Sequence, residues 1–570
     1  MSVMVKKIFA AFKHTISREV AGLHEAAYLL AASSLLSQIL ALFRDRLLAS
    51  VFGATSSLDL YYSAFRIPDL IFATIGSLVS ASVILPFFIE RQAKSHQDAR
   101  EFLSSVFHFY FLTILTVSVC VFLFAPFLLT KLFPVFAARP DFGQLVLMTR
   151  ILLLSPIFLG LSNLFSTVTQ SYRRFFIYSL SPILYNVGII SGIVFFRPIF
   201  GLPGLAIGVA CGAFLHFFMQ IPFAARKGFL PTFISPRDLL KRFRTIKRAI
   251  LISIPRTITV SSNELAELFL ISFASFLLPG SISIFNFSFN LQSVPFAIVG
   301  ISYSMAAFPT LARHIGNGDK ELFVEEMVTS SRHIIFWSLP ITTLFVVLRA
   351  QIVRVILGVG QFDWNDTRLT AAALALFTVS LLAQNMSHLF VRSYYSRGKT
   401  APPLIMNLIS ASLIVVLSYV FVQIFNTVQF FQYFVDSLLK VEDIPGTVIL
   451  MLPLGYTIGV TINMILHWAD FHREFKTYSR RVLRSLFEVA SASVIMGWTS
   501  YMFLKFFDNL FDIHTVIGIF SQGFFSAVIG IAAGVMVLIF LKNAELAEVW
   551  KTLHRKIWKA KVVGPDANTQ

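Results

Sequence analysis

Apolar runs of about twenty residues recur from one end of this chain to the other, and they constrain its fold more than any other feature. A run of about that length is what an α-helix needs to cross the hydrocarbon core of a bilayer. The composition agrees, because 56% of the 570 residues are hydrophobic and only 13% are charged. Soluble domains carry roughly 25% charged residues. We therefore expect an all-α polytopic membrane protein and exclude a soluble enzyme.

Charged residues, Gly and Pro divide the apolar runs into about fourteen transmembrane spans. The predicted spans cover residues 27–52, 58–90, 103–128, 143–171, 177–196, 202–224, 247–275, 281–310, 333–356, 368–393, 402–426, 447–469, 484–508 and 518–541. No segment between them is long enough to fold into a soluble domain.

Lysine and arginine are concentrated in every second segment between the spans, which places them on one side of the membrane. With both termini in the cytoplasm, the inside segments hold 33 of the 47 Lys and Arg residues, and the outside loops hold four. This asymmetry is the positive-inside rule. The net charge of +18 therefore predicts attraction to anionic membrane lipids and no nucleic-acid partner. We expect a multi-pass protein with both termini cytoplasmic.

Four short segments lie outside the spans. Residues 1–26 form a basic tail that predicts an amphipathic surface helix and not a cleaved signal. Residues 225–246 form a basic cytoplasmic linker, and residues 542–570 form a basic cytoplasmic tail. Residues 427–446 predict an amphipathic helix at the outer membrane interface.

The sequence offers no cofactor site. Cys120 and Cys211 lie in apolar stretches and match no zinc or redox spacing, and no phosphate-binding loop is complete. We expect no metal and no other cofactor. The energy for any transport would then come from the gradient of an ion such as a monovalent cation, from the membrane potential, from a substrate gradient or from a partner protein.

An offset of 221 to 222 residues relates two parts of the chain. Asn163 and the Pro182/Asn186 pair recur as Asn385 and the Pro403/Asn407 pair. Because the offset spans an even number of helices, the two halves have the same membrane orientation.

This repeat predicts a transporter. We expect an N-lobe (27–224) and a C-lobe (247–469), related by a pseudo-two-fold axis along the membrane normal and followed by spans 13 and 14 (470–541). Such lobes enclose a cavity and alternate its access by rocking. The alternative is a scaffold that binds lipid without moving it.

Ionisable residues inside spans are costly and are functional candidates by default. Arg44, Asp59 and Arg66 lie in spans 1 and 2, and Arg256 lies in span 7. We expect these four residues to line or border the cavity and to supply its substrate-facing charge. The alternative is that they form ion pairs that only fix helix packing.

Two acids lie deep in span 7. Desolvation favours the neutral form of Glu264 and Glu267 unless a cation or hydrogen bonds offset it. We expect them to couple transport to a monovalent cation, with Asn407 as a neutral oxygen ligand. Arg256 lies on the same helical stripe as Glu267, and the alternative is that it simply holds Glu267 in a permanent pair. Glu264, about 80° away from that stripe, is therefore the favoured ion-responsive residue.

The opening spans resemble a known family. The matching residues are Ser37-Gln38, Arg44-Asp45, Phe52-Gly53-Ala54, Asp59, Ala64-Phe65-Arg66-Ile67-Pro68-Asp69 and Leu85-Pro86. They are similar to the first two helices of the MurJ (MviN) family of lipid II flippases, in the multidrug/oligosaccharidyl-lipid/polysaccharide exporter superfamily. The likeness extends through spans 1 to 12.

The resemblance implies a fourteen-helix flippase and not an enzyme. Its substrate would be the undecaprenyl-pyrophosphate-linked glycopeptide lipid II, moved across the bacterial inner membrane through a cationic cavity between the lobes. It would serve peptidoglycan synthesis, cell-wall biogenesis and cell shape, with cell-wall synthesis proteins as candidate partners.

This chain departs from the family at three cavity positions. Gln38, Phe72 and Asn290 stand where the family has arginine, whereas Arg44 and Asp59 match it and Arg66 keeps a cation. We expect Gln38 and Asn290 still to face the substrate. Because pyrophosphate needs charge-assisted donors, the alternative is an exporter of another lipid-linked oligosaccharide or a small-molecule antiporter of the same superfamily.

Overall fold

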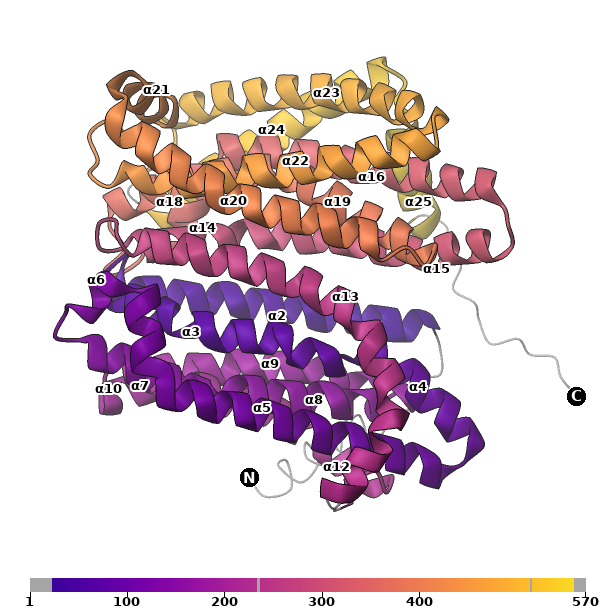
Figure 1. Ribbon diagram of the computed structural model, residues 1–570. Coiled ribbons are helices and arrows are strands. Elements are labelled where there is room, and N and C mark those ends of the chain that lie inside the picture. Colours follow the sequence, from indigo (N-terminus) through magenta and orange to yellow (C-terminus); the bar gives the residue numbers. More distant parts are fainter. Residues whose placement is uncertain (1–22, 233–235, 513–514, 558–570) are drawn as a thin grey trace, which may run out of the picture. The chain divides into compact units, whose positions relative to one another are not determined.

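The structure is a computed structural model that describes residues 23–232, 236–512 and 515–557 (Figure 1). Every element in these ranges is helical. The predicted amphipathic helix of the N-terminal tail falls mainly on residues 1–22, outside the described residues.

Each predicted span coincides with one helix or with a series of short helices. Spans 1 to 6 are α2 (Leu23–Phe52), α3, η1 and α4 (Ser56–Thr74, Gly76–Val79, Ala81–Lys94), α5 (His96–Leu132), α7 and α8 (Phe142–Leu152, Leu154–Ser171), α9, η2 and α10 (Phe175–Ser191, Gly192–Phe196, Arg197–Phe200), and α11 and α12 (Pro203–Phe218, Ile221–Arg226). The short α6 (Pro134–Ala137) follows α5.

Spans 7 to 14 follow the same pattern. They are α13 (Pro236–Ala274), α14, η3 and α15 (Ser281–Phe296, Ala297–Ile301, Ser302–Gly316), α16 and α17 (Lys320–Val347, Arg349–Leu357), α18 and α19 (Trp364–Val379, Leu381–Ser396), α20 (Ala401–Thr427), η4 and α22 (Thr447–Leu450, Met451–Glu474), α23 (Thr477–Phe507) and α24 (Val516–Phe540). Two helices lie outside the spans: α21 (Gln429–Leu439) and α25 (Ala544–Ile557).

Many of these helices suit a membrane by length and composition. Within the described ranges, nine are long and apolar enough to cross one, or up to eleven when each of two bent pairs counts as one span. The other three predicted spans, α2, α13 and α23, are helical but are not among those eleven. The all-α, multi-pass expectation is confirmed.

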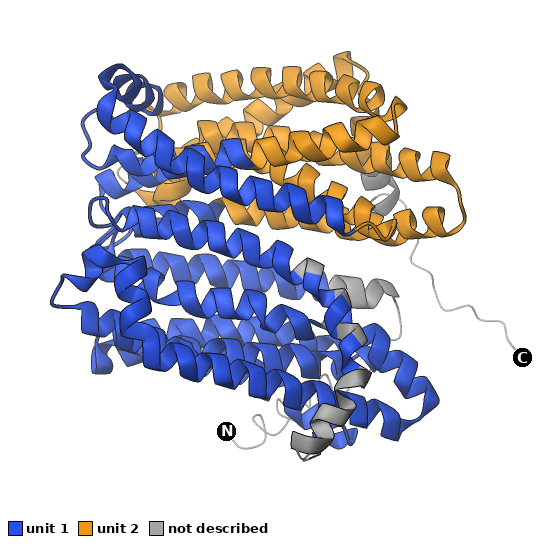
Figure 2. Cartoon of the chain, in the orientation of Figure 1, with its two compact units in different colours: residues 1–291, 356–373, 400–459 blue, residues 292–355, 374–399, 460–570 orange. Residues whose placement is uncertain are grey.

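The chain packs as two compact units (Figure 2). Unit 1 contains residues 1–291, 356–373 and 400–459, and unit 2 contains residues 292–355, 374–399 and 460–570. This division follows contacts between helices, whereas the predicted lobes follow the sequence repeat. The lobes and their symmetry axis stay predictions.

Within unit 1, glycines let α9 and α11 approach backbone to backbone. A Cβ atom on Gly188 would lie 2.2 Å from the Cα of Gly212, and one on Gly208 would lie 2.3 Å from the Cα of Gly192. In lipid the hydrophobic effect does not drive helices together, so their association depends on close van der Waals packing, which small residues permit. This contact fixes the position of α9, which carries the cavity residue Tyr185.

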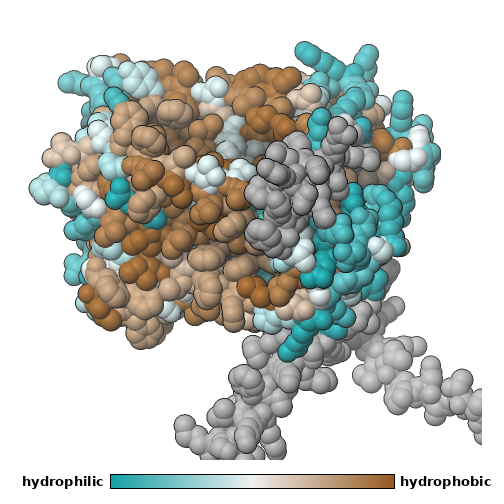
Figure 3. Space-filling view, turned by 60° about the horizontal axis from the view of Figure 1, so that its bottom comes forward, coloured by the Kyte–Doolittle hydropathy of each residue, from teal (hydrophilic) through white to brown (hydrophobic). Residues whose placement is uncertain are grey.

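Exposed side chains agree with a lipid environment. On α5, Leu123, Phe124 and Phe127 are each at least 60% exposed, and on the face drawn in Figure 3 hydrophobic side chains cover a broad area. Patches of that size are rare on soluble monomers. The predicted interfacial helix within 427–446 is α21, which exposes Phe430 and Tyr433.

Unit 2 is built around an aromatic core that includes Phe390, Phe471 and Tyr478. The guanidinium of Arg397 lies over the rings of Phe323, Tyr394, Phe471 and Phe475. Its Nη1 pairs with Glu474 at 2.5 Å.

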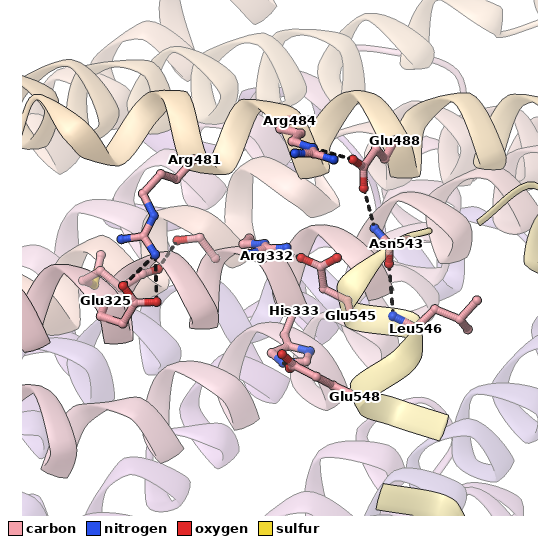
Figure 4. A network of polar contacts seen from close by, with 12 residues as sticks. Glu325, Arg332, His333, Arg481, Arg484, Glu488, Asn543, Glu545, Leu546 and Glu548 are labelled. Carbon is pink, nitrogen blue, oxygen red and sulfur yellow. Dashed lines mark hydrogen bonds and ion pairs between the residues drawn. The ribbon is translucent and has the colours of Figure 1, made fainter. Parts of the chain in front are cut away.

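The C-terminal helix α25 is held in unit 2 by polar contacts (Figure 4). Asn543 caps it, because its Oδ1 accepts the backbone N–H of Leu546 at 3.0 Å while its Nδ2 donates to Glu488 of α23 at 2.9 Å. Glu545 is 2% exposed and pairs with Arg332 of α16. His333 pairs with the exposed Glu548 at 3.0 Å.

Removing the buried carboxylate should loosen α25. Glu545→Gln leaves Arg332 without a counter-charge, and because Arg332 is 31% exposed we expect a loss of about 1–3 kcal/mol, less than for a fully buried pair. Trypsin should then cleave at Lys551 about 5- to 100-fold faster in detergent. Glu548→Gln, which removes an exposed pair, is the matched control and should change the rate little. Equal rates for the two variants would contradict a holding role for Glu545.

Candidate functional site

A cavity of about 520 Å³ lies within unit 1 and is lined by spans 1, 2, 4, 5, 7 and 8. Its volume is that of a typical small-molecule site. The polar residues that line it are Arg44, Tyr61, Tyr62, Arg66, Asp69, Ser77, Ser80, Asn163, Tyr185, Glu264, Glu267, Asn286 and Asn290. The cavity therefore joins residues from both halves of the sequence repeat.

The break between α3 and α4 lies at this cavity. Gly76 and Ser77 of η1, with Ser80 after it, are among the lining residues. Irregular backbone at membrane depth is tolerated where it borders a cavity. The Ser77 hydroxyl is 2.8 Å from the hydroxyl of Thr257, which ties the break to α13.

Arg66 joins three helices at the cavity wall. Its Nη1 donates to Glu267 of α13 at 2.5 Å, and its Nη2 donates to Asn286 of α14 at 2.6 Å. The arginine is 7% exposed. A charge buried to this extent needs a counter-charge and hydrogen-bond acceptors, and these two contacts supply both.

Arg44 has a different arrangement. Its Nε and Nη2 donate to one carboxylate oxygen of Asp45 on the same helix, at 2.9 and 2.8 Å. The other oxygen of Asp45 accepts from Nδ2 of Asn290 at 3.1 Å. Asn290 therefore lines the cavity and also holds the carboxylate that pairs with Arg44.

The charge of the cavity differs from the expectation. The family resemblance implies a cationic cavity, but the ionisable side chains that line it are two arginines and three acids, Asp69, Glu264 and Glu267. Glu267 also has an ion-pair partner that was not predicted, and its expected pair with Arg256 stays a prediction. The partner found is Arg66, which is 201 residues away in sequence. The Arg256 side chain lies outside the described residues.

Asp59 does not line the cavity. Its carboxylate accepts the backbone N–H groups of Gly280 at 2.6 Å and Ser283 at 2.8 Å, and the Ser283 hydroxyl at 2.7 Å. It therefore fixes the N-terminus of α14, where orphan N–H groups and the helix dipole favour an anion. The sequence pattern placed Asp59 and Arg66 on one helical face, but Asp59 faces the end of α14.

The same end of the spans carries a second backbone contact. Oδ2 of Asp366, at the start of α18, accepts the N–H of Ala54 at 3.0 Å, and the N–H of Gln361 donates to the carbonyl of Ser50 at 3.0 Å. Gly280 has a φ of +93°, and a Cβ there would lie 2.2 Å from the carbonyl oxygen of Ala54. Glycine is therefore needed for this approach.

The other predicted site residues lie in different places. Gln38 is half-buried on α2, and Asn407 is buried on α20; neither lines the cavity. Phe72, the second departure from the family, does line it.

Several polar residues of the cavity were missed from the sequence, and Asn286 and Tyr185 illustrate why. Asn286 precedes Asn290 by four residues, a spacing that puts both on one helix face, so this pair is a signal that could have found it. Tyr185 sits beside Asn186 in the repeated Pro/Asn motif but carries no such signal.

Removing the charge of Asp59 should free the end of α14. Asp59→Asn replaces one acceptor oxygen by an amide that cannot accept these N–H groups, so we expect a loss of about 1–3 kcal/mol. The readout is the midpoint of thermal unfolding in detergent. Ser283→Ala, which removes one of the three contacts, should lower the midpoint less. An unchanged midpoint for Asp59→Asn would show that the cap does not hold α14.

Comparison with known proteins identifies the family. The family model described as "Lipid II flippase MurJ" matches residues 48–522. A "Probable lipid II flippase MurJ" of Buchnera aphidicola subsp. Schizaphis graminum is 25% identical over 500 residues, covering 85% of this chain and 92% of that protein. A "Probable lipid II flippase MurJ" of Borreliella burgdorferi is 28% identical over 393 residues, covering 68% of this chain and 75% of that protein.

A solved structure shares the fold. It is titled "Lipid II flippase MurJ, inward closed conformation", and it aligns with a TM-score of 0.71 at 21% identity, covering 90% of this chain and 99% of that one. The family model matches more than half of this chain, including all the cavity helices except the first part of α2. The chain therefore belongs to the lipid II flippase MurJ family.

Proposed function

We propose that this protein is a flippase that translocates lipid II, a lipid-linked glycopeptide precursor of peptidoglycan, across the bacterial inner membrane. The observation that carries the proposal is a cavity at span depth that contains two arginines, in a chain of the MurJ family. Arginine suits a pyrophosphate because its planar fork donates paired, charge-assisted hydrogen bonds.

The proposed mechanism is alternating access. The contacts of Asp59 with α14 and of Asp366 with Ala54 lie at the ends of the spans that the charge bias places outside. They close that end and must break before a headgroup can leave there. A glycopeptide headgroup is larger than the small-molecule ligands that a cavity of about 520 Å³ holds, so the cavity must also widen on binding.

Orientation and partners follow from the same proposal. Both termini would be cytoplasmic, because the basic segments then lie inside. Membrane lipids would cover the exposed apolar faces, and cell-wall synthesis proteins would deliver or consume the substrate.

A second candidate is an exporter of another lipid-linked oligosaccharide, or a small-molecule antiporter of the same superfamily. The three acids of the cavity favour it, because they oppose a dianionic headgroup. Depletion of the protein in its host separates the two. Lipid II that accumulates on the cytoplasmic leaflet supports the flippase, and unchanged lipid II distribution supports the second candidate.

Substituting the cavity arginines should impair transport. Arg44→Gln and Arg66→Gln each remove charge-assisted donors worth about 1.5–3 kcal/mol, so we expect translocation to fall about 10- to 100-fold. The readouts are growth of flippase-depleted cells and lipid II translocation in proteoliposomes. Arg150→Gln is the control, because Arg150 stacks on Phe122 and does not line the cavity. Full activity of both cavity variants would make these arginines structural.

Coupling to a monovalent cation or to the membrane potential is the remaining proposal, with Glu264 as the responsive group. Glu264 lines the cavity and makes no hydrogen bond or ion pair with any described residue, whereas Glu267 is held by Arg66. Asn407, the proposed oxygen ligand, is outside this cavity and would act only in another state. We expect Glu264→Gln to lose the dependence of translocation on imposed sodium, proton or voltage gradients in proteoliposomes. Equal gradient dependence in wild type, Glu264→Gln and Glu267→Gln would remove both acids from coupling.

A further inference from the structure

The two cavity arginines have counter-ions of different kinds. Asp45, the partner of Arg44, is a neighbour on the same helix, and its side chain is 4% exposed. Glu267, the partner of Arg66, comes from another helix, lines the cavity and is 24% exposed. A ligand in the cavity can therefore reach the Arg66–Glu267 pair but not the carboxylate of Asp45.

Arg66 and its neighbour Tyr62 each have a hydrogen-bond donor without a partner among the described residues. These donors are the buried Nε of Arg66 and the buried hydroxyl of Tyr62. Both residues line the cavity. A buried donor without an acceptor carries a desolvation cost. An acceptor-rich group that enters the cavity would give both of these donors a partner.

We propose that Glu267 is a displaceable counter-ion that sets the affinity of the cavity for its anionic substrate. In the empty cavity its carboxylate occupies Nη1 of Arg66. A phosphate oxygen of the substrate takes its place, and Asn286 keeps Nη2 and holds the guanidinium in position. This inference rests on the proposed function, because it assumes a pyrophosphate-linked substrate.

The surrounding charges make the exchange reversible. Once displaced, Glu267 shares the cavity with Asp69 and Glu264, while Arg44 remains paired with Asp45. Like charges in a site of low dielectric repel one another, so the displaced carboxylate competes to return to Arg66. A flippase needs such competition, because a headgroup bound too tightly would not be released on the other side.

The test compares two isosteric variants that each replace one carboxyl group of the same cavity by an amide. Glu267→Gln removes the counter-charge of Arg66, whereas Glu264→Gln does not. The probe is farnesyl pyrophosphate, with farnesol as the uncharged comparison, titrated calorimetrically into the detergent-solubilised full-length protein. We expect Glu267→Gln to bind farnesyl pyrophosphate about 10-fold more tightly than wild type, and Glu264→Gln about 2-fold more tightly.

A double-mutant cycle separates competition from a change of fold. Arg66→Gln with Glu267→Gln should lose the gain seen with Glu267→Gln alone, because the gain depends on a free Arg66. An unchanged elution volume and thermal midpoint in Glu267→Gln confirm that the variant folds; a variant that unfolds or binds less tightly would assign Glu267 a packing role and overturn the proposal.

Two further outcomes test the counter-ion role and the proposed function separately. Equal gains in the two single variants would reduce the effect to general charge and overturn the counter-ion role. Tighter pyrophosphate binding by Glu267→Gln, together with a wild type that neither restores flippase-depleted cells nor translocates lipid II, would keep the counter-ion role and refute the proposed function.

Discussion

A guanidinium buried among transmembrane helices needs both a counter-charge and acceptors for its N–H groups, and Arg66 finds them on helices that are distant in sequence. Its contacts with Glu267 and Asn286 link span 2 to spans 7 and 8. Breaking such a pair leaves an uncompensated buried charge, which costs far more than an exposed pair contributes. Glu267 and Asn286 also line the cavity, so the residues that satisfy Arg66 form part of its wall.

At the end of the spans that carries Asp59, a buried charge must likewise be satisfied by polar partners, but here the charge is negative and the partners are donors. There the buried group is a carboxylate, and it is satisfied by the N–H groups at the start of α14 and by the Ser283 hydroxyl. The close approach of Gly280 to Ala54 leaves no room for a side chain. Backbone groups that cannot meet water in a membrane must be satisfied internally. This end of the spans is therefore held by specific contacts to backbone groups.

The helices could be predicted from the sequence, and the partners of the charged residues could not. The length of the apolar runs predicted fourteen spans, and each of them is helical in the structure. A helix satisfies its backbone hydrogen-bonding groups internally, as a lipid environment requires. Spacing along one helix suggested Arg256 as a partner of Glu267, but the partner found among the described residues comes from span 2. Periodicity ranks the residues of one helix by face and says nothing about which helix will pack against that face. Asp59 shows the same limit, because it shares a face with Arg66 but meets the end of α14 instead of the cavity.

The cavity holds three acids against two arginines. Phe72 and Asn290 line it at two positions where the family resemblance implies arginine, whereas Gln38, at the third, does not line it. Asn290 donates to the carboxylate that pairs with Arg44, so it supports a neutral pair. In the proposed exchange, Arg66 holds the anion while Glu267 competes for the same N–H group. The displaced carboxylate then becomes part of the transport cycle, because its return to Arg66 favours release of the headgroup.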